Sequence, residues 1–149
     1  MEEIKDILPN ISSSVDALEL TLREMDEADC KWIHLFTPGI YVRGIIMPVD
    51  SVIVSRVHKT EHPFNIFKGV VSVKTDNEWN ILEAPFLGVT KPGTRRILVI
   101  KEECIWTTTH AILPEEQPED SSQEALDKAV KKIEDRILFP PLFFEEEMN

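Results

Sequence analysis

Turn-forming residues divide residues 32–112 into short stretches that are rich in Val, Ile, Thr and aromatic side chains. The breaks carry the sequences "TPG" at 37–39, "PVD" at 48–50, "TDNE" at 75–78 and "KPGT" at 91–94. From this rhythm we expect strands at residues 32–36, 40–47, 52–58, 64–66, 69–74, 79–83, 86–90, 96–101 and 104–112. Many short strands without a helix between them predict a mainly β sandwich or small barrel, and they exclude a parallel α/β sheet.

Apolar residues at helical spacing lie on each side of this region. Before it, Ser13 and Asp16 form a capping-box pattern, and one face then carries Val15, Leu18, Leu22 and Met25. After it, the sequence "EALDKAVKKIEDRIL" has one face made of Leu126, Val130, Ile133 and Ile137. We therefore expect an N-terminal helix at about 13–29 and a C-terminal helix at about 122–138, ending before Pro140.

These elements fit a single domain over residues 1–149, a length sufficient for a sizeable core. Its expected parts are an N-terminal helical segment at 1–30, a β-barrel at 31–113, an acidic linker at 114–123, and a C-terminal helix and tail at 124–149. Cys30 and Cys104 lie far apart and outside any CxxC motif, so we expect two reduced, buried thiols and no zinc finger.

Charge is distributed unevenly along the chain. The net charge is −11, which argues against direct binding of nucleic-acid phosphates. Residues 31–101 nevertheless contain ten basic and five acidic side chains, whereas the rest of the chain contains six basic and 22 acidic ones. Two explanations fit this pattern. Either the acidic ends simply keep the protein soluble, or the mildly basic middle binds an anion.

We expect a cytoplasmic protein without a membrane span. No apolar run is long enough to cross a bilayer, and the first residues, "MEEIKDILPN", lack the basic-then-apolar layout of a secretory signal.

Three stretches carry a resemblance to a known family. They are "GIIMPVDSVIVSRVHKTEHPFNIFKG" at 44–69, "APFLGVTKPGTRR" at 84–96 and "WTTTHA" at 106–111. Together they resemble small cupin-like proteins, with an RmlC-like jelly roll, that are encoded by tailed bacteriophages. The resemblance covers about residues 32–112 and implies a cupin-like β-sandwich or jelly-roll barrel. It also implies a location in the host cytoplasm or in the virion.

The resemblance implies a metal pattern that this chain matches only in part. Metal-binding cupins show G-x5-H-x-H-x3,4-E-x6-G followed by G-x5-P-x-G-x2-H-x3-N. With Gly69 as the closing glycine, the glutamate position falls on His62, and the two histidine positions fall on His58 and Arg56. In the second motif the histidine position is Arg96. A third imidazole from His110 would complete a site for a divalent ion such as Zn, Fe, Mn or Ni.

Residue parity gives a broader candidate site. On a regular strand Arg56, His58, Thr60 and His62 share one face, although residues four apart on a straight strand are about 13 Å apart. A turn near Thr60 or a break at Pro63 would therefore be needed for one metal ion. With side chains from other strands, the expected ligand-binding set is Arg56, His58, His62, Arg96, Trp106 and His110. Such a cationic pocket would suit a sugar, a nucleotide or another small anion.

Three interpretations stay open at this stage. The first is a small-anion binder, with or without a divalent metal, which is either a sequestering protein or an enzyme whose catalytic residues the sequence does not identify. The second is a protein–protein interaction module without catalytic activity, such as a virion component or an acidic inhibitor of a host or defence enzyme. The third is a structural barrel whose polar walls are satisfied by hydrogen bonds.

We also expect a homodimer. The apolar residues Leu142, Phe143 and Phe144 in the C-terminal tail need a cover, either the barrel itself or a second subunit.

Overall fold

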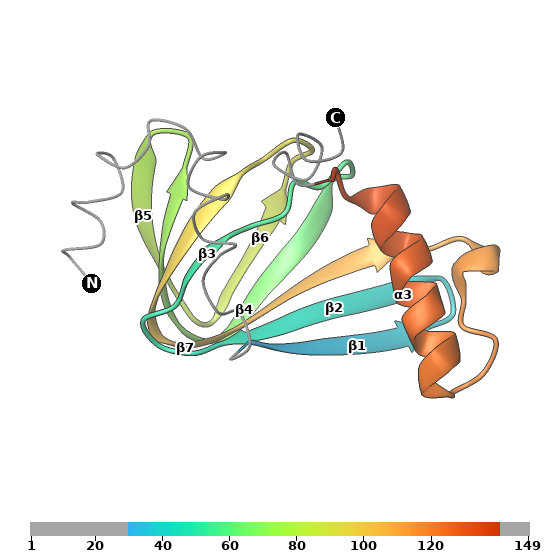
Figure 1. Ribbon diagram of the computed structural model, residues 1–149. Helices are drawn as coiled ribbons and strands as arrows, with labels where there is room; N and C mark the ends of the chain where they lie inside the picture. The colour runs from blue at the N-terminus through green and yellow to red at the C-terminus, as the bar shows by residue number, and fades with distance from the viewer. Residues whose placement is uncertain (1–29, 141–149) are drawn as a thin grey trace, which may run out of the picture.

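The computed structural model describes residues 30–140 (Figure 1). The strands are β1 (Lys31–Thr37), β2 (Ile40–Met47), β3 (Val52–Val54), β4 (His62–Thr75), β5 (Glu78–Glu83), β6 (Phe86–Thr90) and β7 (Arg96–Ala111). A short 3-10 helix, η1 (Pro114–Glu116), precedes the helix α3 (Gln123–Ile137). The helix expected at 13–29 and the apolar tail residues Leu142, Phe143 and Phe144 lie outside the described residues.

All strand pairs are antiparallel, and the hydrogen-bonded order is β1-β2-β7-β4-β5. Two short strands lie off this path, because β3 pairs with β7 and β6 pairs with β4. The long strands β4 and β7 therefore connect both parts of the sheet, and Figure 1 shows them curving from one part to the other. This mainly β, jelly-roll arrangement with one C-terminal helix confirms the expected fold class.

The central strands are longer than the sequence indicates. The stretches 64–66 and 69–74 belong to β4, and the stretches 96–101 and 104–112 form β7 up to Ala111. Gly69 allows β4 to continue, because its φ is +99° and a Cβ atom there would lie 2.2 Å from the carbonyl oxygen of Glu103. The register shifts between Ile66 and Val71 are bulges that bend the strand without ending it.

The expected strand at 52–58 is shorter in the structure, because β3 ends at Val54. Residues 55–61 instead form a loop that leads into β4. The regular parity expected for Arg56, His58, Thr60 and His62 therefore does not apply, and the loop decides where these side chains lie.

Two apolar clusters hold the fold together. The larger one lies between the curved parts of the sheet and includes Met47, Phe64, Ile66, Val71, Leu98, Ile100 and Trp106. The smaller one joins α3 to the ends of β2 and β7 and consists of Tyr41, Ile112, Ile133, Ile137 and Leu138. Figure 1 shows α3 at this end of the sheet. Ser122 caps α3 by accepting a hydrogen bond from the Ala125 amide at 3.2 Å, which confirms the C-terminal helix.

The acidic stretch at 114–123 is anchored to this helix. Glu116 is buried and accepts hydrogen bonds from Arg136 on α3, at 2.5 Å from Nε and 2.8 Å from Nη2.

Within residues 30–140, no helix is both long and apolar enough to cross a membrane.

Candidate functional site

Three histidines from three places in the chain meet at one point. His58 comes from the loop at 55–61, His62 begins β4, and His110 lies near the end of β7. Their ring centroids are 4.3 Å apart for His58 and His62, 4.6 Å for His62 and His110, and 5.4 Å for His58 and His110. One ring nitrogen from each lies within 4.8 Å of the others.

The loop removes the distance problem that a straight strand would pose, and the end of α3 fixes its position. His58 forms an isolated antiparallel bridge with Leu138. The Lys59 amide donates to the Ile137 carbonyl at 2.6 Å, and the Phe139 amide donates to the Val57 carbonyl at 2.9 Å. The turn after β6 adds a further contact, because the Gly93 amide donates to the His58 carbonyl at 3.0 Å.

Each imidazole uses one nitrogen for a hydrogen bond that sets its orientation. His62 donates from Nδ1 to the Thr60 carbonyl at 3.0 Å, and His58 is hydrogen-bonded to the backbone of Arg56. His110 Nε2 and the Thr108 hydroxyl form a hydrogen bond of 2.8 Å, in which either group can donate. A carbonyl only accepts, so the contacts of His58 and His62 hold the protons on their outward nitrogens and leave their other lone pairs facing the cluster.

The inward nitrogens lack partners. Nε2 of His58 and Nδ1 of His110 are buried, and nothing in the described chain forms a hydrogen bond with either atom. Burying a polar atom without a partner costs free energy, so both nitrogens can accept a hydrogen bond from water or bind a ligand. Metal-binding histidines commonly donate their other ring N–H to a backbone carbonyl, as His58 and His62 do.

Electrostatics keep the cluster neutral. Burial, followed by the neighbouring histidines and Arg43, lowers the pKa of His58 to about 3. Burial, together with His62, Arg43 and Arg136, lowers the pKa of His110 to about 3 as well. The pKa of His62 also falls below 6.5, mainly through burial. Neutral imidazole is the form that binds a metal ion, so the protonation state of the cluster at neutral pH is compatible with a divalent ion.

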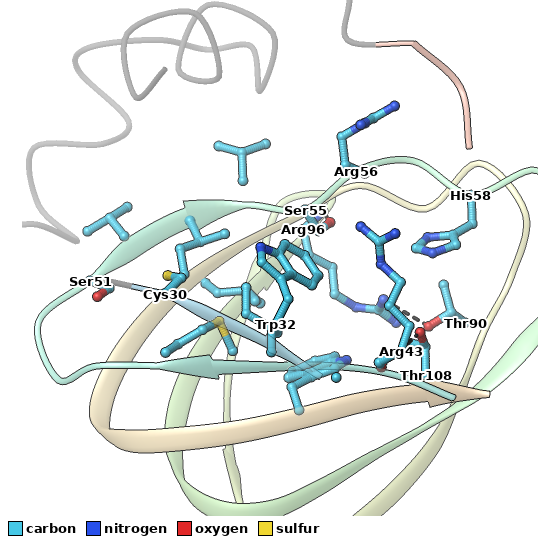
Figure 2. Close-up of a pocket in the computed structure, with 18 of the residues that line it drawn as sticks. Cys30, Trp32, Arg43, Ser51, Ser55, Arg56, His58, Thr90, Arg96 and Thr108 are labelled. Atoms are coloured by element: carbon cyan, nitrogen blue, oxygen red, sulfur yellow. Dashed lines mark hydrogen bonds between the residues drawn. The ribbon is translucent and has the colours of Figure 1, made fainter. Parts of the chain in front are cut away.

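A cavity of about 790 Å³ opens beside the histidines, between β1, β2, β3 and β7 (Figure 2). His58 and His62 line it, and the buried His110 lies behind them, in contact with both rings. The other members of the expected set, Arg56, Arg96 and Trp106, also line this cavity. The structure therefore brings all six of the expected site residues to one region.

Arg96 faces this cavity without a carboxylate partner in the described chain. Its Nη1 donates to the Thr90 hydroxyl at 3.0 Å, and its guanidinium lies 5.0 Å from the Phe64 ring and 5.9 Å from the Trp106 ring. Burial lowers its pKa. No acidic side chain within residues 30–140 forms an ion pair with Arg96, which leaves its charge available to an anion.

The other two arginines that line the cavity, Arg43 and Arg56, contact other parts of the chain. Arg43 forms an ion pair with Glu134 of α3 and covers the Trp32 ring, with its guanidinium carbon 4.5 Å from the ring centroid. Arg56 donates from Nη2 to the Phe139 carbonyl at 2.8 Å.

Sequence reasoning missed several residues of the site, among them Arg43, Trp32, Thr90 and Thr108. A signal for Arg43 was present in "IYVRGIIM", where it shares the strand parity of the buried residues Tyr41 and Met47. A charged residue on an otherwise apolar, inward face indicates a partner or a ligand. His34 has a structural contact, a 2.6 Å hydrogen bond between its Nδ1 and the Tyr41 hydroxyl.

Comparisons with known proteins bear on the fold. No family model matches the sequence, and no curated protein matches it. Salicylate 1,2-dioxygenase from Pseudoaminobacter salicylatoxidans, solved with gentisate, aligns over 63% of this chain with a TM-score of 0.50 and 13% identity. The aligned region spans 29% of the dioxygenase chain, so the likeness concerns one part of a longer protein.

Two smaller proteins are also similar. The Cnp3 cupin domain of Schizosaccharomyces pombe aligns over 64% of this chain and 69% of its own, with 19% identity and a TM-score of 0.47. An RmlC-like cupin from Shewanella frigidimarina aligns over 58% of this chain and 78% of its own, with 18% identity and a TM-score of 0.48. With the strand order described above, the chain has a cupin-like fold.

Proposed function

We propose that this protein is a cupin-like binder of a small anionic ligand, and that His58, His62 and His110 hold a divalent metal ion beside the ligand. The observation that carries the proposal is the set of three inward nitrogens, within 4.8 Å of one another and two of them buried without partners. Nitrogens bound to one tetrahedral ion are about 3.3 Å apart when each bond is about 2.0–2.1 Å long. Small side-chain rotations would bring the three rings to that spacing.

The donor set favours a borderline metal ion. Neutral imidazole suits Zn, Fe and Ni, and Mn accepts it in sites that also offer oxygen ligands. Three protein ligands leave at least one coordination position for water or for a ligand, and a metal with such a position can act as a Lewis acid. Arg96 supports the anionic part of the proposal, since its guanidinium faces the same cavity without a carboxylate partner.

Metal titration tests the proposal. We expect protein treated with a chelator to bind one Zn²⁺ or Ni²⁺ per chain in a calorimetric titration, and the purified protein to contain a divalent ion by elemental analysis. His58→Gln and His110→Gln should each weaken binding by at least tenfold, because each removes one of three ligands. His34→Gln is the matched control, since His34 hydrogen-bonds to Tyr41 outside the cluster.

Melting temperatures and far-ultraviolet circular dichroism of all variants would establish that they are folded. Wild-type protein that binds no divalent ion, or histidine variants that bind it as tightly as the wild type, would contradict the metal site.

A further inference from the structure

The inward faces of three neighbouring strands change from polar to apolar in the same direction. In register across β1, β2 and β7, one level carries His34, Arg43 and Thr108, and the next level carries Trp32, Ile45 and Trp106. The level after that pairs Met47 with Cys104. The cavity is lined by all of these residues except Cys104. Its wall is therefore charged at the histidine end and mainly apolar away from it, where Asp50 and Ser51 are polar members of the lining.

Strand β3 extends the apolar end. Ile53 pairs with Leu98 of β7, and both line the cavity. Figure 2 shows Arg43, Arg96, His58, Thr90 and Thr108 gathered at one end, while Cys30 and Ser51 lie at the other end. Ile45 and Ile53 are only half-buried, and the Trp32 side chain is 51% exposed. These apolar surfaces remain available to a ligand that enters the cavity.

The three arginines at the polar end have different partners. Arg43 forms an ion pair with Glu134, and Arg56 donates to the Phe139 carbonyl. Arg96 retains an unmatched charge, and its planar guanidinium presents parallel N–H donors that fit a carboxylate.

We infer that the ligand is an amphipathic carboxylate, with its carboxylate at Arg96 beside the histidines and its hydrocarbon part directed toward Ile45 and Ile53. This inference rests on the proposed anion-binding function and names the chemical class of the ligand. A cavity of about 790 Å³ accommodates such a molecule. A free sugar or a nucleotide fits less well, because hydroxyl groups placed at Trp32, Ile45 and Ile53 would face apolar side chains.

A series of straight-chain carboxylates tests the inference. Calorimetric titration of chelator-treated wild-type protein with butanoate, hexanoate and octanoate should give one site per chain. The dissociation constant should fall about fourfold for each added methylene, because each buries more apolar surface. Octanamide and octyl phosphate, which replace the carboxylate with a neutral or a larger headgroup, should each bind at least tenfold more weakly than octanoate. These comparisons need no variant.

Two substitutions separate the headgroup from the tail. Arg96→Gln should reduce octanoate binding to the level of octanamide, whereas Lys68→Gln, which removes an equal charge at an exposed site outside the cavity, should leave binding unchanged. Ile53→Trp fills the apolar end, so it should weaken octanoate by at least tenfold and butanoate by less than twofold. A melting curve for each variant would establish that it is folded.

The outcomes separate this inference from the proposed metal site. Affinity that does not depend on chain length, equal binding of octanoate and octanamide, or tighter binding of octyl phosphate would each overturn the amphipathic carboxylate. A protein that binds Zn²⁺ without chain-length dependence would keep the metal site and lose this inference. A protein that binds octanoate with the expected chain-length dependence, but binds no metal ion, would keep this inference and lose the metal site.

Discussion

The two halves of β7 differ in burial and in the kinds of residue they contain. The first half, Ile97 to Ile100, is an uninterrupted apolar run with both faces covered, between β3 and the end of β4. The second half, Cys104 to Ala111, lies between β2 and the start of β4, and its inward face carries Trp106, Thr108 and His110. Exposed Glu102 and Glu103 separate the halves.

This contrast separates stability from binding within one strand. Apolar burial in the first half is favourable without any partner group. Burial of His110 in the second half costs free energy unless its free nitrogen finds a ligand. We therefore expect Ile100 in the first half to matter mainly for stability, and Thr108 and His110 in the second half to matter mainly for binding.

The largest effect is expected at Ile100, which is fully buried in the larger apolar cluster. Ile100→Ala should lower the free energy of unfolding by about 2–5 kcal/mol, because it removes buried methyl groups and leaves a cavity. Chemical denaturation would measure this loss, and calorimetry at a temperature where the variant is folded should find metal affinity unchanged. A loss below about 1 kcal/mol would show that the first half does not carry the stability.

The helix α3 packs against the end of the second half of β7. A substitution of Glu116, which binds Arg136 of α3, tests how much this attachment contributes to stability. Glu116→Gln should lower the free energy of unfolding by about 1–3 kcal/mol at pH 7, because it weakens a charge-assisted pair with Arg136. Hydrogen bonds from Arg136 hold the pKa of the Glu116 carboxyl below its usual 4.5. The pair therefore stabilises the fold fully above pH 4.5, and its contribution is lost as the pH falls through the lowered pKa.

Denaturation of both proteins at several pH values would measure this dependence. The difference in stability between wild type and Glu116→Gln should be constant from pH 7 to pH 5 and shrink below pH 4.5. A difference that stays constant down to pH 3 would contradict an ionised Glu116 in the pair.

Thr108 offers a smaller and more selective test. Thr108→Val removes the hydroxyl that is hydrogen-bonded to His110 Nε2 and orients the ring, so metal affinity should fall by about tenfold to a hundredfold. The free energy of unfolding should change by less than about 1.5 kcal/mol. Thr109→Val is the matched control, because the next residue on the strand faces away from the cluster. Equal effects of the two substitutions on metal titration would contradict an orienting role for Thr108.

The smallest effect is expected at the bend between the halves, where Lys68 and Glu103 form an exposed ion pair at 2.8 Å. Water screens such pairs, so Lys68→Gln should leave both the midpoint of denaturation and metal affinity unchanged. A clear loss of either would mean that the bend couples the halves, and the separation of stability from binding would then fail.

Local rules in the sequence predicted much of this fold. Alternation and turn residues located the strands, and the spacing from Leu126 to Ile137 located α3. The same rules failed where distant segments meet. The sequence predicts a break between a strand at 64–66 and another that starts at Gly69, yet Gly69 permits a bulge against the Glu103 backbone, and β4 continues through it.

The candidate site shows a similar division. Strand parity placed Trp106 and His110 on one face of β7, and the spacing of His58 and His62 raised the question of a metal ion. The loop that solves their separation is held by the end of α3, about 80 residues later in the chain. Arg43 was missed because its partner, Glu134, is 91 residues away. The depressed pKa values of the histidines also depend on burial that no local pattern encodes.

Because of the bridge between His58 and Leu138, we expect the helix end and the histidine loop to open as one unit. Its amide protons, on Lys59 and Phe139, can exchange with solvent only when the two segments separate. A ligand held by His58 would therefore slow hydrogen exchange at residues that do not touch it, in proportion to its affinity for the closed state. Removal of α3 would release the loop that positions His58, so the helix and the site form a single cooperative unit.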